Sequence, residues 1–157
     1  MWQFAEAVAG IGEACRALET PITGGNVSLY NETDGRAILP TPVLGVVGLI
    51  ENADRIATRV FPESGLDIVV FGENLGELGG SEYLHTVHGV LKGVPPVLDL
   101  AREKALQALL VEMVSGGRVT SAHDCSDGGI AVTLAEGSFD SGGIGCTVEL
   151  PPAAGDG

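Results

Sequence analysis

The chain has 157 residues, of which 45% are hydrophobic, and it carries a formal net charge of −13. This length is enough for one domain or two small ones, and the apolar content allows a core. The negative charge argues against nucleic acid or an anionic membrane as a partner, because like charges repel. A nucleotide site would need a cation or a basic partner surface to offset this field.

Three cysteines, Cys15, Cys125 and Cys146, are far apart and show no metal-binding or disulfide spacing. They are expected to be reduced thiols of a cytoplasmic protein. The N-terminus lacks the basic and apolar regions of a signal peptide. No apolar stretch approaches the roughly 20 residues of a membrane span.

Residues 2–18 are predicted to form an amphipathic helix that Thr20 and Pro21 terminate. Its apolar stripe recurs at steps of three and four residues: Phe4, Val8, Ile11, Cys15 and Leu18. The next stretch, TGGNVSLYNET at residues 23–33, organises the first part of the chain. Gly24 and Gly25 permit positive φ and let a ligand lie against bare backbone.

Residues 26–29 are predicted to form a strand, in which Asn26 and Ser28 share one face. Val27 and Leu29 would face the core. An amide oxygen and a hydroxyl beside open backbone suit a polyphosphate with Mg²⁺, which takes oxygen ligands. The alternative is a glycine turn leading into a half-exposed strand. Asn26 and Glu32 together offer two oxygen donors, which by themselves are weak evidence for a metal site.

Asp34-Gly35 is a hairpin turn signal. The run VLGVVGLIE at residues 43–51 is apolar on both faces and predicts a buried strand. Residues 53–61 are expected to form a short helix, and residues 62–65 a hinge between two modules. Residues 66–71 begin the second module as a strand.

Later in the chain, GGSEY predicts either an anion-binding nest or an N-capped helix over residues 81–88. Asp99 is expected to cap a helix that Gly116 and Gly117 terminate. The apolar face of that helix would comprise Leu106, Leu109, Leu110 and Met113. Short strands are predicted at residues 119–122 and 146–150.

HDCSDGG at residues 123–129 is a polar turn before a predicted helix over residues 130–136. A helix N-terminus attracts phosphate through its unpaired N–H groups. Asp127 would compete for those groups as an ordinary N-cap, and this interpretation is favoured. An acid–base pair of His123 and Asp124 is doubtful, because neighbouring residues on a strand face opposite ways.

Helices alternate with strands in the second module, which indicates α/β layers. The first module looks incomplete, since one helix and three strands cannot cover a strand that is apolar on both faces. We expect either that the chain is part of a larger protein or that it associates with itself.

The blocks TPITGGNVSLYNET, PTPVLGVVGLIE, LGGSEYL, LDLAREKALQ and SAHDCSDGGIAVTLAE resemble, in order, the phosphoribosylformylglycinamidine synthase family. The resemblance covers roughly residues 1–136. The last block is shared more loosely with aminoimidazole ribonucleotide synthetase and selenophosphate synthetase. The resemblance implies an α/β (α+β) fold: the end of a second sheet-barrel A domain at residues 1–62 and the start of an α/β B domain at residues 63–157.

The family uses ATP and ammonia from a glutaminase subunit, with a small accessory subunit, to convert formylglycinamide ribonucleotide to the amidine. By resemblance, Gly25 lies at ATP, Asn26 binds Mg²⁺ and Ser28 binds the substrate. Ser126, Gly128 and Gly129 correspond to a possible auxiliary phosphate site.

The family's first repeat and its catalytic histidine have no counterpart in these residues, so the chain resembles a fragment and no catalytic residue is assigned. Two alternatives stay open. One is a sister synthetase or kinase of the same superfamily, and the other is a non-catalytic module that holds a nucleotide or supports assembly.

Overall fold

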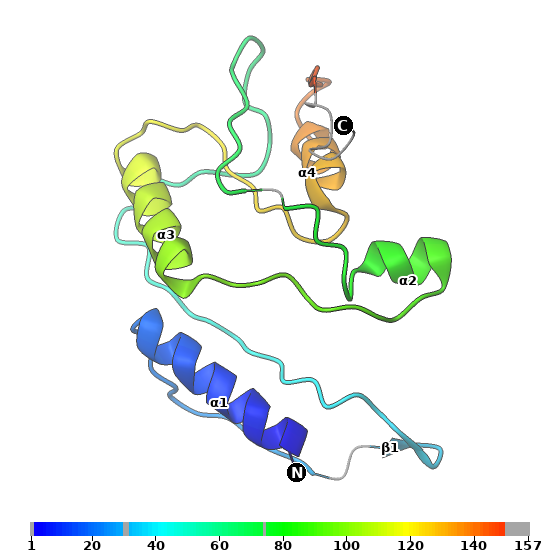
Figure 1. Cartoon of the computed structure of the whole chain (residues 1–157). Coiled ribbons are helices and arrows are strands. Elements are labelled where there is room, and N and C mark those ends of the chain that lie inside the picture. Colours follow the sequence, from blue (N-terminus) through cyan, green and yellow to red (C-terminus); the bar gives the residue numbers. More distant parts are fainter. Residues whose placement is uncertain (1, 30–31, 74, 150–157) are drawn as a thin grey trace. The chain divides into compact units, whose positions relative to one another are not determined.

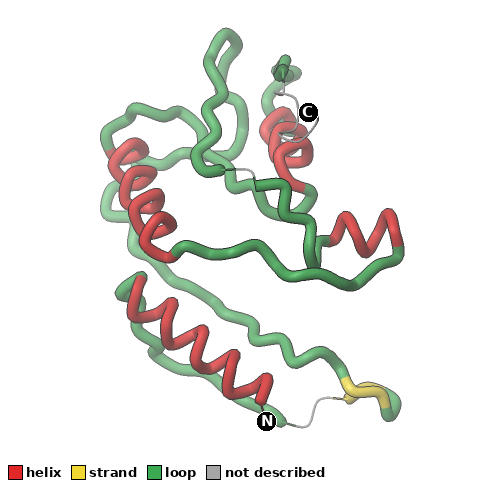
Figure 2. The backbone as a smooth tube through the Cα atoms, in the orientation of Figure 1, coloured by secondary structure: helices red, strands yellow, loops and turns green. Residues whose placement is uncertain are grey.

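The computed structural model describes residues 2–29, 32–73 and 75–149. These residues form four helices and one two-stranded sheet, joined by long irregular segments (Figures 1 and 2). The elements in order are α1 (Trp2–Ala17), β1 (Glu32–Thr33), β2 (Arg36–Ala37), α2 (Glu82–His88), α3 (Leu100–Ser115) and α4 (Gly129–Ser138). No helix in the described ranges is long and apolar enough to cross a bilayer.

The chain divides into two units. The first comprises Met1–Glu51 and Leu98–Ala108, and the second comprises Asn52–Val97 and Leu109–Gly157. The first unit holds α1 and the β1–β2 hairpin, and the second holds α2 and α4. Helix α3 begins in the first unit and ends in the second.

Four of the five predicted helices are confirmed, all but the one over residues 53–61, and local capping explains where α2 and α3 begin. Ser81 Oγ accepts a hydrogen bond from the Leu84 amide at 3.3 Å, so GGSEY begins α2 as an N-capped helix. Asp99 Oδ1 accepts from the amides of Ala101 and Arg102 at 3.0 and 3.1 Å, which satisfies two of the unpaired N–H groups at the start of α3.

The end of α3 is a Schellman motif. The Arg118 amide donates to the Met113 carbonyl at 2.9 Å, and the Gly117 amide donates to the Val114 carbonyl at 3.0 Å. Gly117 adopts a left-handed φ of 66°, which glycine reaches without a steric penalty. The predicted stop at Gly116 and Gly117 is confirmed.

The hairpin turn is also confirmed. Strands β1 and β2 pair antiparallel, with Glu32 opposite Ala37 and Thr33 opposite Arg36. Asp34 and Gly35 have φ values of 52° and 74°, and two positive values in succession are the mark of a type I′ turn. This two-residue connection sets the register of the pair without help from distant residues.

The longer predicted strands are wrong for the described residues. Residues 26–29, 43–51, 66–71 and 146–149 are irregular, residue 150 lies outside the described residues, and residues 53–61 form no helix. The predicted strand at 119–122 is reduced to one parallel bridge between Thr58 and Ser121, with the Ala122 amide donating to the Thr58 carbonyl at 2.9 Å. Neither a sheet barrel nor an α/β layer is formed within these ranges, because a strand needs a neighbour to complete its hydrogen bonds.

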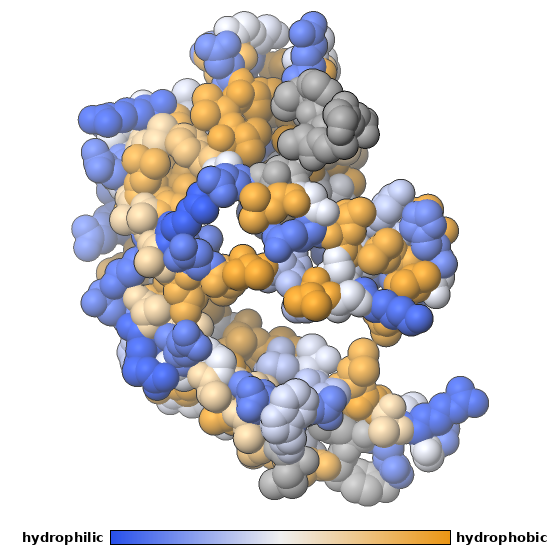
Figure 3. Space-filling view, viewed as in Figure 1, coloured by the Kyte–Doolittle hydropathy of each residue, from blue (hydrophilic) through white to orange (hydrophobic). Residues whose placement is uncertain are grey.

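The predicted core is likewise missing from the described residues, where no hydrophobic side chain is buried. Val43 and Val47, expected in a buried strand, are 93% and 97% exposed. The chain exposes 13177 Å², whereas a folded monomer of 16.0 kDa exposes about 7,400 Å². Apolar side chains accordingly reach the surface among hydrophilic ones in Figure 3.

Within the first unit, an open apolar groove lies between α1 and the segment that follows the hairpin. Its lining comprises Ile11, Ala14, Cys15, Leu18, Thr20, Leu44, Val46 and Gln107. One side of the predicted stripe of α1 therefore meets the apolar segment. Lys104 Nζ lies 3.2 Å from Glu19 Oε2, which joins the first turns of α3 to the second residue after α1.

We predict that the chain associates with itself through the apolar strip, defined as residues 43–50. Unpaired backbone groups and exposed apolar side chains recruit other chains. Added salt should strengthen association, because it screens the repulsion of a −13 chain. Light scattering over a range of protein and salt concentrations measures this.

The matched test replaces Val46 and Val47 by Thr, which keeps the shape of the side chain but exchanges one methyl group for a hydroxyl. We expect association to weaken about tenfold, which corresponds to about 1.4 kcal/mol. Val111→Thr is the control, because Val111 is 66% exposed on α3 outside the strip. A monomer at every concentration, or an equal effect of the control, would contradict the prediction.

Candidate functional site

The GGNVS segment at residues 24–28 is an exposed, irregular connection after α1. Val27 and Leu29 are 64% and 67% exposed, so the expectation that they face a core is wrong. Within residues 2–29, 32–73 and 75–149, no partner strand pairs with the segment to fix its two faces. The predicted side-by-side placement of Asn26 and Ser28 therefore depends on a strand that the described residues do not form.

Nothing in the described chain requires glycine at the start of this segment. Neither Gly24 nor Gly25 adopts a positive φ, and a Cβ added at either position would meet no atom within 4 Å. The backbone at Gly25 is therefore open on the side where a side chain would stand. An open backbone is the property that close approach of a phosphate needs.

Asn26 fits the role of a ligand for a hard cation. Among the described residues its side chain makes no hydrogen bond, and it is exposed. An amide oxygen in this state is available to Mg²⁺, which accepts a few protein oxygens and retains water. Tyr30 and Asn31, the next polar positions of the motif, lie outside the described residues.

The second candidate region is the HDCSDGG turn, which leads into α4 as predicted. The N-cap residue of α4 is Gly128 at φ 80°, and no side chain caps the helix. The favoured interpretation of Asp127 as the N-cap is therefore wrong. Gly128 is required on two counts, because its φ is left-handed and a Cβ there would overlap the Val132 side chain.

The groups expected to bind phosphate use their donors within the turn. The Ser126 hydroxyl donates to Asp124 Oδ2, and the Gly129 amide donates to the Ser126 carbonyl at 3.0 Å. An anion would have to replace these bonds. Ser126, Gly128 and Gly129 are thus brought together at the start of α4, but in this conformation two of the three are already paired.

His123 and Asp124 do form a pair, contrary to the argument from strand alternation. His123 Nδ1 lies 3.1 Å from Asp124 Oδ1. Residues 122–126 belong to no strand, so strand alternation does not apply to them. The Ser126 hydroxyl, the Asp124 backbone N–H and the His123 ring hold the pKa of the Asp124 carboxyl below its ordinary value.

Sequence reasoning missed the partner of the other ring nitrogen. His123 Nε2 lies 2.8 Å from Glu136 Oε2, which α4 places one turn beyond Thr133. The Thr133 hydroxyl in turn donates to the Asp124 carbonyl at 3.1 Å. A spacing of three residues puts Thr133 and Glu136 on the same helix face, but nothing in the sequence shows that this face meets the turn.

Two family models match the chain. The model described as AIR synthase related protein, C-terminal domain, matches residues 63–156, and the corresponding N-terminal domain model matches residues 1–50. The chain therefore belongs to the AIR synthase related family.

Its curated relatives carry a more particular name, phosphoribosylformylglycinamidine synthase subunit PurL. The protein of this name from Moorella thermoacetica is 52% identical over 149 residues, and that from Thermobifida fusca is 50% identical over 151 residues. These matches cover 95% and 96% of this chain. The resemblance inferred from the motifs is confirmed.

The chain spans about one fifth of the length of these relatives, since the matches cover 20% of each relative. The relative from Anaeromyxobacter sp. (strain K) shows the same proportion, with 53% identity over 160 residues, 96% of this chain and 21% of the relative. No solved structure matches the chain.

We predict that the Ser126–Gly129 turn binds ADP only with Mg²⁺ or with the remainder of a full-length enzyme. A helix dipole contributes about 0.3–1 kcal/mol at an exposed site. One carboxylate about 4 Å from a phosphate charge opposes it by about 1 kcal/mol in water. Asp124 and Asp127 are both in the turn, so repulsion should dominate until a cation offsets it.

Calorimetry measures the affinity for ADP in the presence of chelator and in the presence of Mg²⁺. Changes in the NMR chemical shifts of the Ser126 and Gly129 amides show whether ADP binds at the turn. Asp127→Asn should improve binding in chelator, whereas Asp67→Asn, the same charge change outside the turn, should affect it less. Tight ADP binding by the unaltered chain in chelator would show that the repulsion is overestimated.

Proposed function

We propose that this chain is part of a synthetase that converts formylglycinamide ribonucleotide to formylglycinamidine ribonucleotide in purine biosynthesis. The reaction would consume ATP and glutamine-derived ammonia and release ADP and phosphate, as an amidoligase does. The observation that carries the proposal is 52% identity over 95% of the chain to a relative named for this synthase. The activity is proposed for the longer protein, since the chain spans a fifth of it.

The proposed chemistry first makes the amide oxygen a leaving group. The terminal phosphoryl group of ATP passes to that oxygen, ammonia adds to the carbon, and phosphate departs with the oxygen as the amidine forms. Such a reaction depends on orientation of the reactants and on stabilisation of developing charge.

In this proposal, three residues of the GGNVS segment have separate roles. Gly25 leaves room for ATP phosphates against the backbone, Asn26 holds Mg²⁺ through its amide oxygen, and Ser28 orients the ribonucleotide substrate. Mg²⁺ supplies positive charge that offsets the phosphates and the acidic chain. The open backbone at Gly25 and the unpaired side chain of Asn26 within the described residues support these assignments.

The proposed partners are a glutaminase subunit, which supplies ammonia, and a small accessory subunit, in a cytoplasmic complex.

An assembly or nucleotide-holding role is the second candidate. The exposed apolar strip favours it, because Val43 and Val47 are over 90% exposed and need a covering surface.

We predict that the 157-residue chain alone makes no amidine from formylglycinamide ribonucleotide, ATP, Mg²⁺ and ammonia. The reason is that three substrates must be oriented together, and the chain offers one exposed segment for them. Product analysis after incubation of a highly purified sample checks this. Turnover that scales with the amount of chain would contradict the prediction.

In a full-length enzyme that contains this segment, we predict that Asn26→Ala lowers turnover with Mg²⁺ and ATP on the order of 10²-fold. Melting should hardly change, because the side chain is exposed and makes no hydrogen bond within the described residues. Asn52→Ala is the matched control: Asn52 Oδ1 accepts from the Asp54 amide at 2.9 Å, so its loss should affect local structure and not turnover. If Asn26→Ala turns over as fast as the unaltered enzyme, Asn26 does not bind Mg²⁺ in the reaction. If the variant melts at a much lower temperature, Asn26 has a structural role instead.

A further inference from the structure

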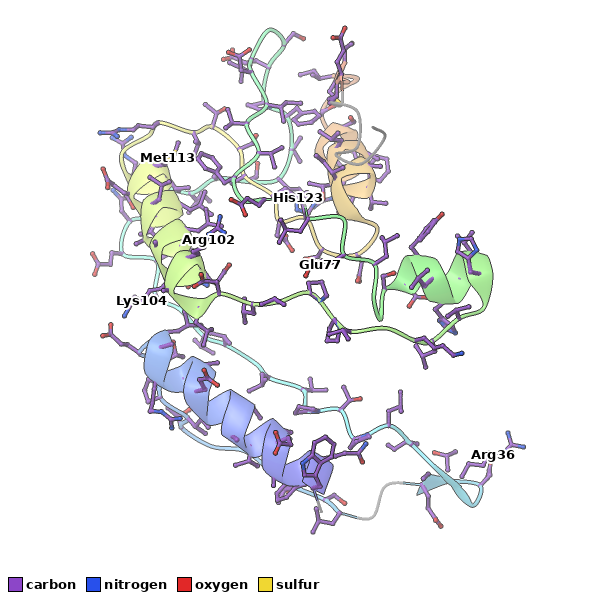
Figure 4. All side chains as sticks on the ribbon, in the orientation of Figure 1. Arg36, Glu77, Arg102, Lys104, Met113 and His123 are labelled. Carbon is purple, nitrogen blue, oxygen red and sulfur yellow. The ribbon has the colours of Figure 1, made fainter. Side chains whose placement is uncertain are left out.

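His123 lies between two carboxylates that approach different nitrogens of its ring. Nε2 is 2.8 Å from Glu136 Oε2 and Nδ1 is 3.1 Å from Asp124 Oδ1. The side chain is 19% exposed, which makes it far less accessible than Asp124 at 75%. Figure 4 shows His123 on the segment that runs into α4.

An ionised carboxylate only accepts hydrogen bonds, and a neutral imidazole has one N–H to donate. Both contacts can be hydrogen bonds only when each ring nitrogen carries a proton. We propose that His123 is a proton-dependent clasp, in which the doubly protonated ring ties Asp124 of the turn to Glu136 of α4. Loss of one proton releases one carboxylate.

The proton that leaves is the one on Nδ1. The Nε2 contact is shorter, and its carboxylate is less exposed, since Glu136 is 42% and Asp124 is 75% exposed. Asp124 also keeps a second donor, the Ser126 hydroxyl. The neutral ring therefore stays bound to Glu136, and its Nδ1 lone pair then faces the Asp124 carboxylate and repels it.

The clasp acts on the part of the turn that leads into α4. Ser126 donates to Asp124 by its side chain and accepts from the Gly129 amide by its carbonyl. The Thr133 hydroxyl holds the Asp124 carbonyl and does not depend on the ring. Opening of the clasp should therefore move Ser126 and Gly129, the first residue of α4, while the rest of α4 and the Asp124 backbone stay in place.

Charged groups lie on the turn, on α4 and on the neighbouring segments, and of these Asp124 and Glu136 lie within hydrogen-bond distance of the ring. On the turn they are Asp124 and Asp127, and on α4 Glu136 is the one ionisable residue. On the segment that pairs with residues 121–122, Arg59 lies 3.8 Å from Asp140. Glu77, on the segment before α2, accepts from the Val97 amide.

The Asp124 carboxylate is the acceptor next to Nδ1 of the ring. The pKa of Asp124 is lowered, chiefly by the Ser126 hydroxyl, so its carboxylate remains charged in mild acid. Histidine changes charge between about pH 5 and 8. The closed form binds the extra proton, so its population is high in mild acid and falls as the pH rises.

The test is ¹⁵N NMR of the ring nitrogens of the 157-residue chain from about pH 5 to 8. His123→Gln assigns the His123 signals among the three histidines. We expect two protonated nitrogens in mild acid, then loss of the Nδ1 proton with Nε2 still protonated. The Ser126 and Gly129 amide signals should move over the same pH interval.

Two variants separate the clasp from a general effect of histidine titration. Asp124→Asn should abolish the coupled movement of Ser126, and Glu136→Gln should remove the preference for Nε2–H in the neutral ring. His85→Gln is the matched control, because His85 faces one carboxylate, Glu82 at 3.3 Å, on the exposed helix α2. It should leave the pH response of Ser126 and Gly129 unchanged.

The unaltered chain provides two decisive measurements that do not depend on how the variants fold, and Glu136→Gln provides a third. If the Ser126 and Gly129 amides do not follow the ring signals of His123, the clasp is refuted. The same holds if neutral His123 carries its proton on Nδ1, or if Glu136→Gln, with unchanged circular dichroism, leaves the His123 signals unaltered.

Discussion

The need to cover apolar backbone segments is the constraint on which the rest of this structure depends. The segments expected to be strands are rich in valine, leucine and isoleucine, yet they meet no layer within the described residues, and Val43 and Val47 are almost fully exposed. A strand gains stability from a neighbour that completes its hydrogen bonds and from a surface that covers its side chains. Where neither is supplied, the segment stays irregular.

The same constraint explains which elements do form. Helices satisfy their backbone within one segment, so α1, α2, α3 and α4 need only capping and modest packing. Ser81 and Asp99 supply caps within three residues, and the Schellman bonds at Gly117 close the end of α3. The β1–β2 hairpin forms because Asp34 and Gly35 bring two neighbouring segments together directly.

The two candidate regions differ in how much of them this chain supplies. At GGNVS the described part of the chain contributes an open backbone at Gly25 and an exposed amide at Asn26. At HDCSDGG the chain makes most of the contacts itself. There His123, Asp124 and Ser126 are linked to α4 through Glu136 and Thr133, and the donors expected to meet an anion are partly used in that network.

The sequence by itself determined the helices, the Asp34-Gly35 hairpin and the family, because each follows from signals that act over a few residues or from motifs preserved in order. It could not determine whether residues 43–51 find a partner strand, since that depends on segments far away in sequence. Only the tertiary structure showed that Gly128 and not Asp127 precedes α4, and that His123 meets Glu136. Those contacts join the turn to a helix that follows it in the chain. Alternation along an ideal strand gave the wrong answer for His123 and Asp124, because these residues belong to no strand.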